Sequence, residues 1–289
     1  MKRLRSGLKR LIDSLLQTRV VRLFVATVEG AVAHDAAHRA AGVAYYSLLS
    51  IFPMLLGLIA VFGYFLPSVD FQERLLEFVG KNIPGAADVL RQNIMNIVTL
   101  RGGMGIISIL LLLWSASAMF SAISLSINRA WDVHQHRLPF LLRKAREIGM
   151  VIGIGLLFLV SLGASSVISI FRRISDVTWA DSLFVHAGSR LVAFLLVFLV
   201  FLLLYKFIPA VRTRWNYVWP GALLAALLFE LSRSLFILYL DNLVNFALVY
   251  GSIASIILLL IWIYYSAFIM IMGAEFSYQY SCLRSPESG

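Results

Sequence analysis

Residues 250–274 read YGSIASIILLLIWIYYSAFIMIMGA, an apolar stretch without a single Asp, Glu, Lys or Arg. A helix rises about 1.5 Å per residue, so roughly 20 apolar residues suffice to cross the hydrocarbon core of a bilayer. The stretch is longer than that and is apolar on all sides, which is typical of a helix surrounded by lipid or by other helices. It therefore predicts a membrane-spanning helix.

Five more stretches of the chain have about 20 or more residues and are mostly apolar. In lipid every backbone polar group must be paired within the segment, which favours helices. We therefore predict an all-α integral membrane protein, built as a six-transmembrane-helix bundle. The predicted spans are about 40–66, 105–127, 148–170, 189–208, 218–240 and 250–274.

The composition agrees with this fold class. The chain has 289 residues, of which 60% are hydrophobic and 14% are charged. Soluble domains contain about 45–50% apolar and about 25% charged residues, so a soluble core would leave much of this apolar surface in water. The net charge of +10 would suggest nucleic-acid binding in a soluble protein. Cys282 is the one cysteine, which excludes an intramolecular disulfide.

The 25 Lys and Arg residues are distributed unevenly between the two sides of the predicted bundle. Seventeen lie on the side of the two chain ends, seven lie on the other side, and Arg233 lies inside a span. Because Lys and Arg accumulate in cytoplasmic loops, this bias predicts that the N-terminus and the C-terminus are both cytoplasmic. It also explains the basic composition without nucleic acid, so no nucleic-acid partner is expected.

Three regions outside the spans complete the predicted organisation. Residues 1–39 form a basic N-terminal segment, in which apolar residues recur at helical spacing. This pattern predicts an amphipathic cytoplasmic helix, either lying on membrane lipids or packed against the bundle. The longest connection, 67–104, predicts a helical periplasmic loop that caps the bundle. Residues 276–289 are expected to form a short cytoplasmic tail after a membrane domain at 40–275.

Pro53 interrupts the first predicted span. It removes one backbone hydrogen bond, and Ser50 is close enough in the helix to help compensate for the loss. A kink is expected here, which could be a static bend, or else a hinge or a ligand contact.

Glu230 and Arg233 fall near the middle of the fifth predicted span. Ionisable groups at that depth are costly and are functional candidates by default. Their i, i+3 spacing places them on one face of the helix. Two interpretations remain open: an ion pair that holds helices together, or a proton or anion site that lines a polar cavity.

A second polar group lies near the cytoplasmic ends of the first and last spans. Asp35 and Arg39 precede the first span, and Glu275 follows the last one. They could form a gate-like cluster at the inner interface. The alternative, which we favour from the sequence, is ordinary solvation at the membrane surface.

No pattern in the sequence points to a metal, a cofactor or an enzyme. His34 and His38 have the i, i+4 spacing of a helical zinc pair, but Asp35 replaces the usual Glu and no third ligand is evident. A ribonuclease would need acid/base or metal-binding residues gathered in a soluble site, whereas the predicted loops offer mainly Arg and Lys. A phosphate-binding G-x-x-x-x-G-K-[ST] motif does not occur.

Short motifs in a fixed order run from Asp35 to Glu275. After Asp35 they are AAGVAYYSLLSIFP at 40–53, NRAW at 128–131, YKFIP at 205–209, FELSR at 229–233, LY at 238–239, VYGS at 249–252 and GAE at 273–275. As a set they resemble the YihY/BrkB family of bacterial inner-membrane proteins. Members of that family have been called virulence factor BrkB and, by a historical mislabelling, ribonuclease BN.

The resemblance implies a multi-pass protein of the bacterial inner membrane with six spans, and it implies no settled activity. It also marks the family-motif and hinge candidates among the residues of this chain. These are Asp35, Tyr45, Ser50, Pro53, Tyr250, Gly251, Gly273 and Glu275.

A role in transport or permeation of a small solute, an ion or a lipid best fits these features. The alternative is a non-catalytic membrane scaffold in cell-envelope assembly, and an intramembrane enzyme ranks last. Membrane lipids are the expected partners. Six spans are few for a complete transporter, so a homodimer is a further expectation.

Overall fold

Helices are the regular secondary structure in the part of the chain that the computed structural model describes. That part comprises residues 19–65, 105–133, 142, 144–145, 148–150, 153, 179–241 and 253–284. No strand occurs among these residues, which confirms the all-α class. The helices are α2 (Arg19–Ala33), α3 (Ala36–Phe65), α6 (Gly105–Ala130), α8 (Trp179–Phe207), α9 (Trp215–Asp241) and α11 (Ile253–Arg284).

Five of the six predicted spans coincide with these helices. The remaining prediction, at 148–170, lies almost entirely outside the described residues, as does the predicted periplasmic cap at 67–104. Within the described part, two helical segments are long and apolar enough to cross a membrane, Trp215–Leu240 and Ala254–Arg284. The number of spans therefore stays a prediction.

The ends of the helices differ from the predicted boundaries. Helix α11 continues to Arg284, well beyond residue 274, because Glu275 and Gln279 find partners inside the fold and do not end the helix. Helix α8 begins earlier than predicted, at Trp179. Helix α3 runs from Ala36 to Phe65 and so contains Pro53 without ending there. The predicted kink stays a prediction.

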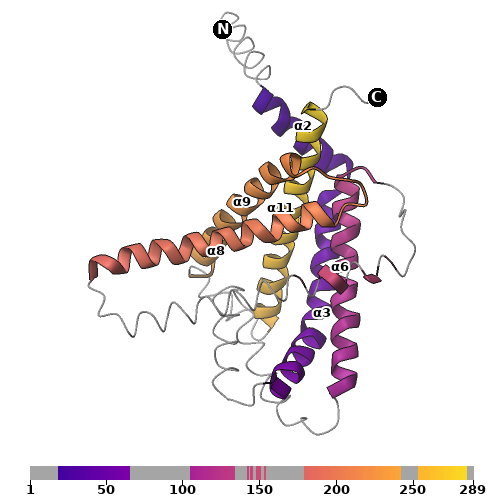
Figure 1. Cartoon of the computed structure of the whole chain (residues 1–289), viewed down its shortest axis with the longest axis vertical. Helices are drawn as coiled ribbons and strands as arrows, with labels where there is room; N and C mark the ends of the chain where they lie inside the picture. Colours follow the sequence, from indigo (N-terminus) through magenta and orange to yellow (C-terminus); the bar gives the residue numbers. More distant parts are fainter. Residues whose placement is uncertain are drawn as a thin grey trace, which may run out of the picture.

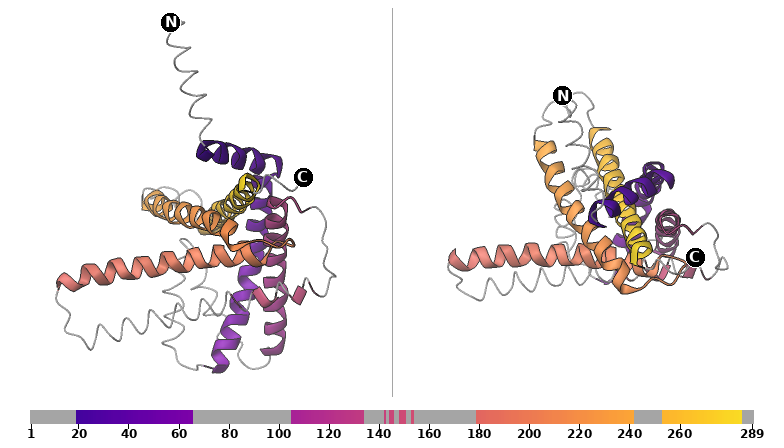
Figure 2. Two further views of the ribbon diagram at one scale, coloured as in Figure 1. Left: turned by 45° about the horizontal axis from the view of Figure 1, so that its top comes forward. Right: turned by 90° about the horizontal axis from the view of Figure 1, so that it is seen from above.

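The helices do not form a simple parallel bundle. Helices α3 and α6 lie side by side over much of their length, and α11 packs against α2, α3 and α9 (Figure 1). Helix α8 crosses this group at a steep angle, and its N-terminal part extends away from the other described helices (Figure 2). The fourth helix thus departs from the predicted arrangement.

Helix α2 lies across the end of α3 and packs against α11 (Figure 2). Leu23, Thr27 and Ala31 are buried at successive turns, as expected for one face of a helix. This contact agrees with the packed alternative for the part of the N-terminal segment in α2, and residues 1–18 lie outside the described residues. Apolar residues remain exposed elsewhere on α2, namely Phe24, Val25, Val28 and Val32.

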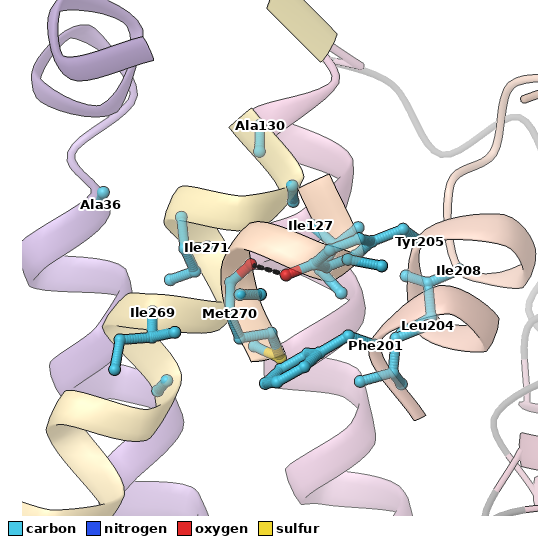
Figure 3. Close-up of a cluster of buried hydrophobic side chains, with 14 of the residues drawn as sticks. Ala36, Ile127, Ala130, Phe201, Leu204, Tyr205, Ile208, Ile269, Met270 and Ile271 are labelled. Carbon is cyan, nitrogen blue, oxygen red and sulfur yellow. Dashed lines mark hydrogen bonds between the residues drawn. The ribbon is translucent and has the colours of Figure 1, made fainter. Parts of the chain in front are cut away.

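The buried core lies where α6, α8, α9 and α11 meet. Ile127 of α6, Tyr205 of α8 and Ile271 of α11 are among its most deeply buried side chains (Figure 3). The Tyr205 hydroxyl donates a hydrogen bond of 2.7 Å to the carbonyl oxygen of Met270. This bond gives the buried phenol a partner, as buried tyrosines generally require.

Glycines let α9 and α11 cross at close range. A Cβ atom added to Gly273 would overlap the Tyr205 hydroxyl and Ala225, and would lie 2.9 Å from the carbonyl oxygen of Gly221. One added to Gly221 would overlap Ser277 and the carbonyl oxygen of Gly273. Small residues at a helix crossing allow such backbone approach in membrane proteins.

Candidate functional site

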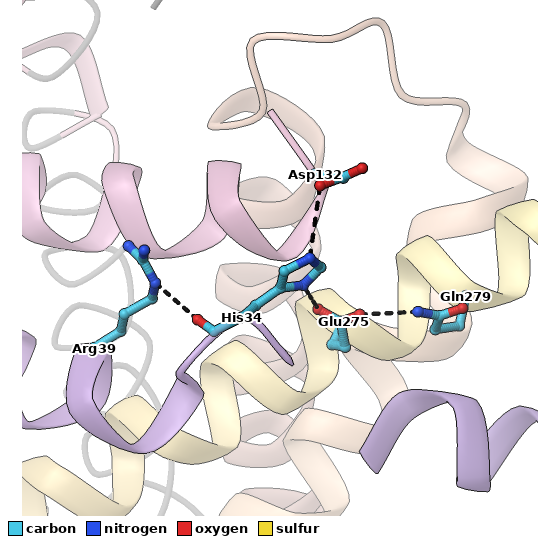
Figure 4. Close-up of polar contacts among 5 residues, drawn as sticks. All are labelled: His34, Arg39, Asp132, Glu275 and Gln279. Carbon is cyan, nitrogen blue, oxygen red and sulfur yellow. Dashed lines mark hydrogen bonds and ion pairs between the residues drawn. The ribbon is translucent and has the colours of Figure 1, made fainter. Parts of the chain in front are cut away.

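Polar side chains from three parts of the chain converge at one end of the fold. We call His34, Asp132, Glu275 and Gln279 the His34 cluster (Figure 4). The Nδ1 atom of His34 lies 3.0 Å from Oε2 of Glu275, and its Nε2 atom lies 3.6 Å from Oδ1 of Asp132. Each ring nitrogen thus faces a carboxylate, and imidazolium is the form that donates at both positions.

Two sharp helix ends bring these groups together. Asp35 follows α2 with φ 53°, and Asp132 follows α6 with φ 55°. Asp adopts this left-handed conformation more readily than most residues, so both helices can end abruptly. A Cβ atom on Gly30 would overlap the Glu275 carboxylate, so glycine there is what lets α11 bring Glu275 up to α2.

Glu275 is fully buried, with 0% of its surface exposed. A buried carboxylate needs hydrogen bonds or a countercharge. It faces His34 and also accepts a 3.0 Å hydrogen bond at Oε1 from Nε2 of Gln279. Ordinary interfacial solvation, the alternative that the sequence favours, is therefore wrong for Glu275.

The predicted gate-like group is only partly assembled. The Nε atom of Arg39 donates a 2.9 Å hydrogen bond to the backbone oxygen of His34, so Arg39 braces the turn behind the cluster. Asp35 is exposed. The residues that face Glu275 are His34, which the sequence suggests only as half of a zinc pair, and Gln279, which the sequence does not suggest as a site residue.

The two histidines of the zinc pattern do not lie on one continuous helix, which the i, i+4 spacing requires. His34 lies in the turn between α2 and α3, whereas His38 lies inside α3 and is exposed. Both ring nitrogens of His34 already face carboxylates. Within the described ranges, no group of three or more His, Cys, Asp or Glu side chains is arranged to hold a metal ion.

A pocket of about 710 Å³ opens between α3, α9 and α11. Its wall is mostly aromatic and aliphatic, and Tyr45 from the family motif belongs to it. Hydroxyl groups come from all three helices. The lining residues include Tyr45, Ser232, Phe236, Tyr239, Tyr264 and Tyr265.

Glu230 and Arg233 flank the pocket residue Ser232 in sequence but are not part of the pocket wall. The two side chains lie 3.6 Å apart and are 33% and 27% exposed, respectively. The pair is therefore at the side of α9 and only partly covered by the described residues. Whether it acts as a site stays a proposal.

The other motif candidates are placed as follows. Ser50 is buried, and Gly273 forms the close crossing of α9 and α11. Pro53 lies in α3, in a part whose side chains are outside the described residues, and Tyr250 and Gly251 lie outside the described residues entirely.

Asn128 is a structural residue that sequence reasoning did not single out. Its Oδ1 atom accepts a 2.7 Å hydrogen bond from the backbone amide of Ala210, and its Nδ2 atom donates to the backbone oxygen of Ser124 at 2.7 Å. Asn128 therefore fixes the connection between α8 and α9 to the end of α6. The signal that could have found it is its position directly after a predicted span, as the first residue of the NRAW motif.

Comparisons with known proteins agree on one family. The model of the family described as Virulence factor BrkB matches residues 27–288. The ribonuclease-like protein YfkH of Bacillus subtilis is 31% identical over 252 residues, which is 84% of this chain and 89% of that protein. A UPF0761 membrane protein of Photobacterium profundum is 31% identical over 84% of this chain and 76% of its own length.

A UPF0761 membrane protein of Pelodictyon phaeoclathratiforme is 30% identical over 88% of this chain, which spans only 59% of that relative. No solved structure matches the chain.

Proposed function

Because the chain belongs to the Virulence factor BrkB family, and two of its relatives bear the name UPF0761 membrane protein, we propose that it is a transport or permeation protein. Its substrate would be a small solute, an ion or a lipid. The observation that carries this proposal is the pocket of about 710 Å³ between α3, α9 and α11. Two of these helices contain the segments long and apolar enough to cross a membrane.

The chemistry of the pocket wall narrows the substrate class. Ligand pockets are typically apolar with a few placed polar groups. Here the hydroxyls of Tyr45, Ser232 and Tyr264 stand on a wall that includes Phe236, and no described lining residue is charged. This wall favours an amphiphile, such as a lipid or a solute with an apolar body, over a bare ion.

The charge bias of the sequence supplies the orientation in this proposal. Both chain ends would be cytoplasmic in the bacterial inner membrane, and the His34 cluster would lie at the inner end of the bundle. The pocket residue Tyr264 precedes Glu275 by 11 positions in α11, which corresponds to about 16 Å along a helix. The pocket would then lie within the hydrocarbon layer.

Blocking the pocket tests the proposal. The chain, reconstituted into lipid vesicles, would be assayed for movement of a fluorescent lipid between leaflets and for leakage of a small fluorescent solute. The variant Ser232→Trp places a large side chain in the pocket. Leu231→Trp is the matched control, because Leu231 is the preceding residue of α9, is exposed and does not line the pocket.

The proposal expects flux from the wild-type chain, its loss in Ser232→Trp and its retention in Leu231→Trp. Equal flux in both variants would remove the pocket from the pathway. Absence of lipid or solute flux from folded wild-type protein would contradict transport and would favour the scaffold. Light scattering of the purified chain in detergent, before reconstitution, would give its molar mass and so show whether it is a homodimer.

A further inference from the structure

The motif Asn128–Trp131 contains two donor groups that the described fold does not use. The Nε atom of Arg129 and the Nε1 atom of Trp131 are buried, and neither has a hydrogen-bond partner among the described residues. Buried donors are nearly always paired in folded proteins, so an unpaired one calls for a specific explanation. Both groups lie at the end of α6, which closes on the turn at Asp132.

Arg39 brings a second guanidinium group to the same end of the fold. Its Nε atom is bound to the backbone oxygen of His34, and its terminal nitrogens point away from Glu275 and Asp132 (Figure 4). The ring of His34 in turn lies 3.6 Å from Asp132, three residues after Arg129. Arg39 of α3 and Arg129 of α6 therefore lie beside the His34 cluster, on two helices that pack together.

Arg39 lies close enough to Arg129 for the two positive charges to repel each other. Burial, and after it the positive charge of Arg129, lowers the pKa of Arg39, whereas Asp35 raises it to a smaller extent. The nearby carboxylate thus does not offset the neighbouring guanidinium. Glu275 already faces His34 and Gln279, so it is engaged elsewhere. An anion between the two arginines would relieve their repulsion.

We propose that Arg39 and Arg129 bind a phosphate group at this end of α3 and α6. Guanidinium groups offer several donors in a planar fork that matches phosphate oxygens, and they form strong charge-assisted hydrogen bonds. The neighbouring helix α2 exposes Phe24 and Val28, as a helix at a membrane surface would. The phosphate belongs either to an anionic lipid headgroup or to a free phosphate compound.

This site is separate from the pocket of the proposed function. Neither arginine lines that pocket. A binding measurement therefore tests the phosphate site without any flux assay. If the wild-type chain binds the phosphate probes but shows no flux, only the proposed function is contradicted. If it shows flux but binds neither probe, only this inference is contradicted.

The experiment uses the full chain in detergent, with phosphatidylglycerol and inorganic phosphate as the two probes. Native mass spectrometry counts bound lipid, and a competition series adds phosphate. The variants are Arg39→Gln and Arg129→Gln. Arg212→Gln is the matched control, because it removes the same charge from an exposed position in the connection between α8 and α9.

We expect phosphatidylglycerol to bind the wild-type chain and the Arg212→Gln control equally. Removing one charged donor pair should weaken binding about tenfold to a hundredfold in Arg39→Gln and Arg129→Gln. Arg129→Lys keeps the charge and should retain part of the affinity. If Arg129→Gln does not fold, Arg39→Gln decides the test, because Arg39 is only partly buried.

The two sources of phosphate give different patterns. Displacement of the lipid by inorganic phosphate would show that the site takes phosphate groups in general, and binding of the lipid without displacement would identify the headgroup. The inference is overturned if neither probe binds the wild-type chain. It is also overturned if Arg39→Gln and Arg129→Gln bind both probes as tightly as Arg212→Gln does.

Discussion

The two halves of α11 meet very different surroundings. Near Gly273 the backbone of the helix lies close to the backbone of α9 at Gly221, and farther along the buried Glu275 faces partners from the α2–α3 turn and from its own helix. From Leu260 to Tyr265 the same helix borders a pocket of about 710 Å³. One helix therefore carries both a close-packed joint, at Gly273–Gln279, and one wall of an open pocket.

This difference suggests that one region of α11 serves stability and the other serves binding. Close-packed joints are sensitive to changes of a single atom group, whereas a pocket tolerates changes in its wall. Substitutions near Glu275 should therefore unfold the protein, and substitutions near Tyr264 should alter what it binds. Stability and flux measurements on variants in the two regions can break that division, and a change at Glu275 should lower stability the most.

Glu275→Ala should cause the largest loss. It leaves His34 and Gln279 without their shared acceptor, and removing one partner of a buried pair typically costs about 3–5 kcal/mol. The measurement is the free energy of unfolding in mixed micelles under a denaturing detergent. Glu29→Ala, at an exposed position of α2, is the control and should change stability by less than about 0.5 kcal/mol. Equal effects in both variants would mean that the His34 cluster does not stabilise the contact between α11 and the α2–α3 turn.

Gly273→Leu should come next. Its side chain must occupy space held by Tyr205, Ala225 and the Gly221 carbonyl, and overpacking of this kind costs about 1–3 kcal/mol. The same titration measures it. Gly42→Leu, in α3, is the matched control, because an added Cβ there meets nothing within 4 Å. A destabilised Gly42→Leu with an intact Gly273→Leu would reverse the assignment of tight and open regions.

The helices themselves could be predicted because each apolar run is local in sequence. The run at 250–274 became α11, although the helix extends to Arg284. That extension could not be foreseen, because a hydropathy pattern takes Glu275 for a solvated end. Its burial depends on His34, a residue 241 positions away in the chain.

The candidate site was harder to predict for the same reason. Tyr45 was singled out by its motif, but the pocket also needs Ser232 and Tyr264, whose common wall depends on how three helices tilt. His34 was weighed as a zinc ligand, because sequence spacing assumed one continuous helix through residues 34–38. The left-handed turn at Asp35 breaks that helix and redirects the imidazole toward Glu275.

Asn128→Ala should have an intermediate effect. It leaves the Ala210 amide without its acceptor and frees the connection between α8 and α9, and an unpaired buried donor costs about 1–3 kcal/mol. Asn128→Asp keeps an acceptor for Ala210 and should recover part of the loss. Limited proteolysis between Pro209 and Arg214 would report the loosened connection directly. Unchanged cleavage in Asn128→Ala would show that the connection is held by other contacts.

Tyr205→Phe should have the smallest effect within the joint. The change keeps the buried ring and removes one neutral hydrogen bond to the Met270 carbonyl, which is worth about 0.5–1.5 kcal/mol. That carbonyl can still accept a bond from its own helix, so no acceptor is left bare. Tyr265→Phe, at an exposed ring that lines the pocket, should leave stability unchanged but alter lipid or solute flux. If Tyr265→Phe proved the more destabilising of the two, the pocket would be part of the joint, and the division between the two halves of α11 would fail.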